Sequence, residues 1–172
     1  MKHLDSPDAL NPGDILLFSR ARGINRIITW ATRSPFYHVA LYTGDFQVVE
    51  ARPRGVVARD LRKRDGGGVC FKVVPAPEGK GVGAVVWART QIGDSYDVVG
   101  VLVLVLERLF VTLNLNYTAR DKFSCAEFVA TVYREVGVTL FPDLLPRDVV
   151  PADFERLLPA GAEVCSFAVG ES

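Results

Sequence analysis

Five short apolar segments in the first half of the chain constrain the fold most. Each is rich in β-branched or other apolar residues and is bounded by turn residues, as β-strands are. They are "DILLF" (14–18), "HVALYT" (38–43), "QVVEA" (47–51), "GVVARDL" (55–61) and "VCFKVV" (69–74), with Gly44-Asp45, Pro53 and Gly66-Gly67-Gly68 among the turns between them. Their spacing predicts an antiparallel meander.

Helical patterns follow these strands. One covers about 79–93 and stops at Gly93, and a second runs from about Tyr96 to Leu113. A third begins near Cys125, carries one apolar stripe and ends at Gly137, and a short helix is expected at 151–158. Strands first and helices later predict an α+β fold in one domain of 172 residues, with residues 1–11 as a mobile segment.

Composition excludes several classes of function. Twenty basic and twenty acidic residues balance, so no nucleic-acid partner is expected. Three widely spaced cysteines argue against a disulfide framework, and with only two histidines no metal site or other cofactor is expected. No secretory signal is visible, and the apolar run Val98–Leu106 is shorter than the roughly 18 residues that span a bilayer, so a cytoplasmic location is the default expectation.

Cys125 is the candidate nucleophile. It lies in "DKFSCAEFVATVYREVG" at the expected start of a helix, where Asp121 or Ser124 would act as the cap. Free amide groups and the helix dipole lower the pKa of a thiol in this position, and the thiolate is the reactive form. The alternative is a small buried residue on the apolar stripe, and this segment does not decide between the two.

His38 is the candidate base, because the only other histidine, His3, lies in the polar N-terminal stretch. A catalytic imidazole needs a group that orients its other nitrogen, and Glu50 is the candidate. A three-residue hairpin loop, 43–45, would place Glu50 directly opposite His38 on one face of the sheet. A two-residue loop, Gly44-Asp45, would pair His38 with Ala51 and turn Glu50 to the other face.

The sequence also resembles a known family. In order along residues 12–137 stand "PGDILLF", "SPFYHVALYTGDFQVVEA" with "GV" shortly after, "GDSYDVVG" and "FSCAEFV". This series resembles the NlpC-type cysteine peptidase superfamily, in particular its circularly permuted papain-fold branch (YiiX/YebB-like), in which histidine precedes cysteine. The resemblance implies a papain-like fold with a cysteine at the N-terminus of a helix packed on an antiparallel sheet.

The resemblance implies roles for named residues. Cys125 would be the nucleophile, His38 the general base and acid, and Glu50 the orienting residue. Tyr37, Tyr96 and Ser124 are candidates for polarising the substrate carbonyl, while Arg52 and Arg54, within the basic stretch 51–65, are candidates for binding substrate carboxylates. Core aromatics and a solvated basic loop are the alternatives for the tyrosines and the arginines.

Three functions are compatible with these residues. The first is a peptidase or amidase, a hydrolase acting through a thioester on small or peptidoglycan-type peptides, without a metal or organic cofactor. The second is a lipid acyl hydrolase or acyltransferase with Val98–Leu106 at a membrane surface. The third is a binding module that kept the fold without turnover. Exposure of Val98–Leu106 would favour lipid, and its burial would favour peptide.

Overall fold

A computed structural model describes residues 2–4, 6–19, 29–30, 33–53, 55–63, 70–96 and 122–167 of the chain. Arg54, the apolar run Val98–Leu106 and nearly all of the expected helix at 96–113 lie outside these residues. The side chain of Tyr96 also lies outside the description, although its backbone is part of a short strand.

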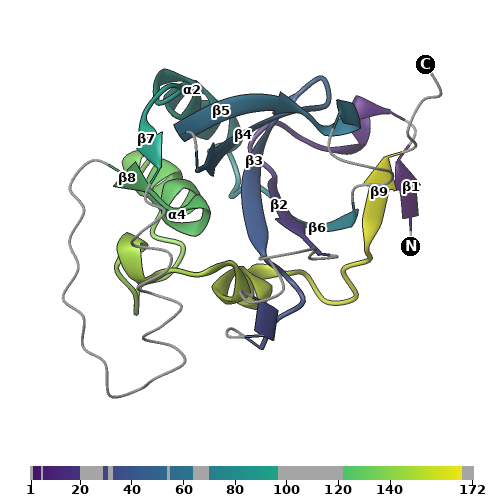
Figure 1. Ribbon diagram of the computed structural model, residues 1–172. Helices are drawn as coiled ribbons and strands as arrows, with labels where there is room; N and C mark the ends of the chain where they lie inside the picture. The colour runs from purple at the N-terminus through teal and green to yellow at the C-terminus, as the bar shows by residue number, and fades with distance from the viewer. Residues whose placement is uncertain are drawn as a thin grey trace.

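An antiparallel sheet forms the centre of the molecule (Figure 1). Six antiparallel strands stand in the order β9-β6-β2-β3-β4-β5, and β1 adds to β9 in parallel. The strands are β1 (Lys2–Leu4), β2 (Ile15–Phe18), β3 (His38–Gly44), β4 (Gln47–Arg52), β5 (Gly55–Asp60), β6 (Cys70–Val74) and β9 (Cys165–Phe167). The five strands expected from the apolar segments are therefore confirmed, while β1 and β9 were not expected.

The strand order corrects the expected meander. Strands β2, β3, β4 and β5 follow one another as neighbours, whereas β6 pairs with β2 instead of with β5. Strand β2 is buried along its whole length, so its backbone groups need partners on both sides. Strand β6 supplies the second partner and packs Phe71 against Phe18, with ring centroids 6.0 Å apart.

Two helices lie on one side of the sheet (Figure 1). They are α2 (Gly81–Thr90) and α4 (Cys125–Glu135), close to the expected positions. Their apolar faces join Val39 and Leu41 of β3 in one core cluster, whereas Ala40 and Tyr42 belong to a second cluster on the other face. This alternation along β3 is that of a strand buried on both faces. The described residues thus form the α+β arrangement that the sequence predicted.

Short elements complete the description. The 3-10 helices are η1 (Pro7–Ala9), η2 (Leu61–Lys63), η3 (Pro146–Asp148) and η4 (Pro151–Leu157), the last at the site of the expected short helix. Strands β7 (Ser95–Tyr96) and β8 (Lys122–Phe123) pair in parallel. The segment expected to be mobile, 1–11, contains β1 and η1, and its Leu4 and Leu10 are buried in the second cluster.

The hairpin between β3 and β4 has neither of the two expected loops. Its turn residues are Asp45 and Phe46, both at positive φ (50° and 59°), and Gly44 pairs with Gln47 across them. Positive φ at both central positions defines the type I′ turn that suits the twist of a hairpin. An irregularity between Tyr42 and Gly44 then shifts the register, so that Tyr42 pairs with Val48 and Leu41 with Val49.

Candidate active site

The N-terminus of α4 presents Cys125 as the first helical residue. Ser124 is the N-cap: its hydroxyl accepts a hydrogen bond from the Glu127 amide (3.1 Å), and the Glu127 carboxylate accepts one from the Ser124 amide (3.3 Å). This reciprocal capping box fixes where the helix begins. Ser124, one of the two expected caps, is therefore confirmed in that role. Phe128, Val129 and Val132 anchor the helix in the core, so the position of Cys125 is set by packing.

Strand β3 meets this helix end at its first two residues. The pairing of β3 with β4 begins only at Leu41 and Val49, so the start of β3 lies beyond the paired region. There the backbone amide of Val39 donates a hydrogen bond to the Cys125 sulfur, and the side chain of His38 forms another with the same sulfur. Cys125 is 7% exposed and His38 9%, so both residues are largely shielded from water.

Glu50 binds the other side of the imidazole. Its Oε2 lies 2.6 Å from Nε2 of His38, which leaves Nδ1 as the ring nitrogen available to the thiol. Extended by one residue beyond Leu41 and Val49, the register places Glu50 opposite Ala40, two residues along β3 from His38 and on the same face. Glu50 thus shares a face with His38, as the three-residue loop would have required, but through a diagonal contact instead of a direct cross-strand pair.

Two aromatic rings also lie next to the imidazole. Phe18, the neighbour of His38 on β2, has its ring centroid 5.7 Å away, and the Tyr37 ring is stacked at 6.3 Å. These contacts and the Glu50 bond together limit rotation of the ring. An imidazole held in this way keeps one tautomer and one orientation, as a base in acyl transfer requires.

Two arginines contact Glu50 at its second oxygen. Nη1 of Arg52 lies 3.2 Å and Nη1 of Arg59 lies 3.9 Å from Oε1. Glu50 itself is 0% exposed, so its charge is balanced by protein groups and not by water. Arg52, a candidate for binding substrate carboxylates, here contacts the buried carboxylate of Glu50.

The electrostatics of the thiol and the imidazole favour an ion pair. Burial acts to lower the pKa of His38, but the attraction of Cys125 and then of Glu50 outweighs it and the pKa is raised. Burial acts to raise the pKa of Cys125, yet the charge of His38 and the hydrogen bonds from His38 and Val39 lower it. Each group thus stabilises the charged form of the other, which is how a reactive thiolate is kept near neutral pH.

The three residues expected to act together, Cys125, His38 and Glu50, are thus in contact. Tyr37 lies beside the imidazole as a partly buried aromatic, and the side chains of Arg54 and Tyr96 are outside the described residues. Sequence reasoning missed Arg59. The signal was available in part, since Arg59 lies two residues from Val57, the partner of Glu50 on β5, and therefore on the same face.

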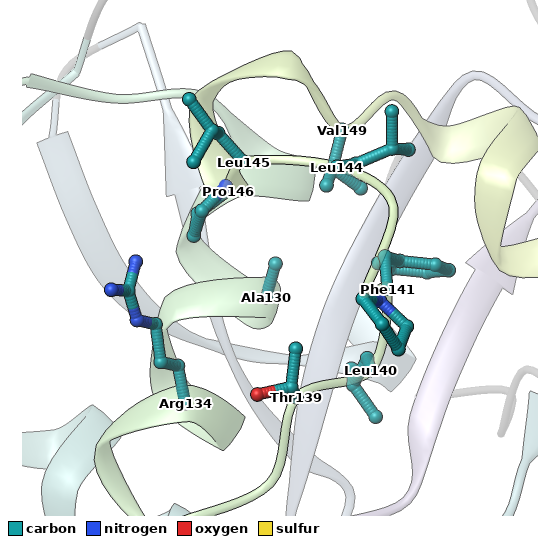
Figure 2. Close-up of a pocket in the computed structure, with 10 residues that line it drawn as sticks. Ala130, Arg134, Thr139, Leu140, Phe141, Leu144, Leu145, Pro146 and Val149 are labelled. Atoms are coloured by element: carbon teal, nitrogen blue, oxygen red, sulfur yellow. The ribbon is translucent and has the colours of Figure 1, made fainter.

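A separate cavity of about 220 Å³ lies further along α4 (Figure 2). Ala130 and Arg134 on the helix face the segment 139–149, whose contributing side chains are mostly apolar. Cys125, His38 and Glu50 do not line it. The cavity is therefore distinct from the cysteine-histidine pair.

The described residues contain no group of three or more His, Cys, Asp or Glu side chains arranged to hold a metal ion. Within the same part of the chain no helix is long and apolar enough to cross a membrane. Comparison of the sequence with protein-family models gives no match, and a search of curated proteins gives no significant one. Any assignment of function therefore depends on the geometry of the site.

Proposed function

We propose that this protein is a cysteine-dependent hydrolase of the peptidase or amidase type. The single observation that carries the proposal is the contact series from Cys125 through His38 to the fully buried Glu50. A thiol that only filled space would not need an imidazole partner, and a histidine that only filled space would not need a buried carboxylate at 2.6 Å. Together they match the requirements of nucleophile, base and orienting group.

The proposed reaction is acyl transfer through a thioester. The Cys125 thiolate attacks the substrate carbonyl carbon, and the resulting oxyanion is stabilised by backbone N–H groups at the start of α4. His38 donates its proton to the departing nitrogen, and the C–N bond breaks to leave the acyl group on sulfur. His38 then takes a proton from water, the hydroxide attacks the thioester carbon, and the thiolate leaves with the carboxylic acid as product.

Two further features support an amide as the scissile bond. An amine is a poor leaving group unless it is protonated. Burial acts to lower the pKa of His38, but Cys125 and Glu50 outweigh this effect and raise it, which keeps a proton available on the imidazole. The α+β arrangement, with the cysteine at a helix N-terminus and the histidine on the sheet, also agrees with the resemblance to the permuted papain-fold branch. We therefore propose a small or peptidoglycan-type peptide as the substrate. The lipid-ester alternative depended on Val98–Leu106, which the described residues do not include.

The first test is alkylation of Cys125 by iodoacetamide across pH, followed at the level of single peptides by mass spectrometry. Cys70 and Cys165 are buried, form no disulfide and serve as internal references in the same tube. We expect Cys125 to label fastest near neutral pH, and His38→Ala to slow it by about 10- to 100-fold because the thiol returns toward its ordinary pKa. His3→Ala is the matched control, since it removes the only other histidine.

A substrate panel then separates the classes of reaction. Peptide amides, isopeptides and phospholipid esters are offered to wild type and to Cys125→Ala, which loses the nucleophile while keeping a small side chain. Hydrolysis of amides by wild type that is lost in Cys125→Ala supports the proposal. Hydrolysis of the phospholipid esters alone would instead identify the protein as a lipid acyl hydrolase. If Cys125 labels no faster than Cys70 at any pH, the catalytic proposal fails.

A further inference from the structure

The charge around Glu50 exceeds what an orienting carboxylate needs. One oxygen, Oε2, is bonded to His38, and the other, Oε1, lies 3.2 Å from Arg52 and 3.9 Å from Arg59. The arginine side chains are 34% and 27% exposed, so their guanidinium groups sit between the buried carboxylate and solvent. The carboxylate thus contacts His38, which can lose its proton, and two arginines, which stay charged.

The arrangement matters because His38 changes its charge during the proposed reaction. After it gives its proton to the leaving group, Glu50 would be a buried anion with no counter-charge if His38 were its only cation. Burial disfavours such an anion, so the proton would be held on the His38–Glu50 pair. A pair that holds its proton too tightly is a poor acid in the first step and a poor base in the second.

We propose that Arg52 and Arg59 are positioning residues that keep Glu50 ionised throughout the reaction, so that His38 can release its proton while its Nε2–H stays bonded to Oε2. This inference rests on the proposed function. Among the described residues, the charged and titratable groups in contact with the pair include Arg52 on β4, Arg59 on β5 and Cys125 on α4.

The β-ladder sets this arrangement. In the pairing of β4 with β5, Glu50 lies opposite Val57 and Arg52 opposite Gly55, and Arg59 follows Val57 by two residues. Since side chains two residues apart on a strand share a face, Glu50, Arg52 and Arg59 all project from the same face of two neighbouring strands. The contact of both arginines with Oε1 therefore follows from the register of the sheet.

The test is an NMR titration of His38, with the histidine rings isotopically labelled, in full-length Cys125→Ala protein. That background removes the coupling to the thiol, so the observed midpoint belongs to the His38–Glu50 pair. We expect the double variant Arg52→Gln/Arg59→Gln to raise the midpoint of the His38 titration by about one pH unit. Two cations no longer repel the imidazolium, and protonated His38 is then the cation that balances the charge of Glu50. The variant Arg52→Lys/Arg59→Lys keeps both charges, so its His38 midpoint should stay close to that of the Cys125→Ala protein.

Controls separate the possible outcomes. Arg62→Gln removes an arginine that pairs with Asp60 and should leave the midpoint unchanged. If the double glutamine variant does not fold, Arg59→Gln alone, which loses the longer contact, should still give a smaller upward shift. An unchanged or lowered midpoint in a folded glutamine variant overturns the proposal.

A second measurement tests the competing role of the two arginines as a substrate-anion site. Proteins with Cys125 intact are alkylated with neutral iodoacetamide and with anionic iodoacetate. If the glutamine variants lose only a preference for iodoacetate and their His38 midpoint is unchanged, the arginines bind anions and the positioning role is refuted. The titration needs no reactive thiol, so its failure can be told apart from failure of Cys125 to label in wild type.

Discussion

Replacing Glu50 with glutamine tests the centre of the site, because it removes one charge and keeps the size of the side chain. Glu50 is 0% exposed and its Oε2 lies 2.6 Å from His38, so solvent screens this interaction little. Opposite charges at such a distance shift a pKa by about 1 to 3 units, and each unit corresponds to about 1.4 kcal/mol. We therefore expect Glu50→Gln to lower the pKa of His38 and to cost about 1 to 4 kcal/mol of stability where His38 is protonated.

The sign of the pH dependence follows from the direction of the shift. The pKa of folded His38 is raised above 6.5, because Cys125 and Glu50 outweigh the opposing effect of burial. A group with a raised folded pKa contributes stability that is complete below its unfolded pKa and is lost as pH rises through the folded one. The difference in unfolding free energy between wild type and Glu50→Gln should therefore be largest near pH 6 and shrink toward pH 9.

Urea denaturation at pH 6 and pH 9, followed by circular dichroism, measures this difference. The comparison is repeated in a Cys125→Ser background, because Glu50 also repels the Cys125 thiolate and the two titrations are linked. Glu135→Gln, an exposed carboxylate at the end of α4, is the matched control and should change little at either pH. A difference that is equal at both values, or that grows with pH, would refute the assigned coupling of Glu50 to His38.

Three further substitutions test how the elements around the site are built, each by thermal or urea unfolding. Ser124→Ala removes the N-cap of α4 and should cost about 1 kcal/mol, with slower labelling of Cys125 because the helix start loosens. Gly83→Ala should stabilise by about 0.5 to 1 kcal/mol, since a Cβ there meets only Val136 at 3.5 Å, an ordinary contact. Gly81→Ala on the same helix should destabilise strongly, because its Cβ would lie 2.2 Å from the Pro12 carbonyl oxygen. Equal effects of the two glycine substitutions would contradict this account.

Local pattern was sufficient to predict the elements that carry the site. Strands β3 and β4 and helix α4 lie where the sequence predicted them, and residue type narrowed the cap of α4 to Asp121 or Ser124, of which Ser124 is observed. The contact between Cys125 and His38 was reached by a chemical argument, that a nucleophilic thiol needs a base and the chain offers one credible histidine. The choice was narrow because the chain contains only two histidines.

The hairpin register could not be predicted in the same way. Gly44-Asp45 is a turn signal, but the turn uses Asp45 and Phe46, and Phe46 is at a positive φ that bulky residues rarely adopt. Its amide bonds to the Tyr42 hydroxyl (3.2 Å) and its ring lies under the Arg62 guanidinium at 4.7 Å. Contacts with residues outside the turn therefore offset the local cost, and a rule based on local residue preference gave the wrong loop.

The partner of β6 and the contact of Arg59 with Glu50 escaped prediction for a related reason. Both depend on which strands lie side by side, and the sequence of a strand states its faces but not its neighbours. Strand β6 follows β5 in the chain but pairs with β2, on the side of β2 opposite to β3, because β2 is buried and needs a second partner. The sequence around Arg59 is typical of a basic loop, but the pairing of β4 with β5 places Arg59 next to the buried carboxylate of Glu50.

The order of histidine and cysteine along the chain need not affect the chemistry, because the contact between them depends on how two elements pack. What the proposed reaction requires is a helix N-terminus, with its free amides, against the first residues of a strand that carries the base. Here α4 packs on β3 through Val39 and its neighbours, and that contact brings Cys125 to His38 whichever element is made first. A chain in which the strand precedes the helix can thus build the same ion pair, provided that the packing between the two elements is kept.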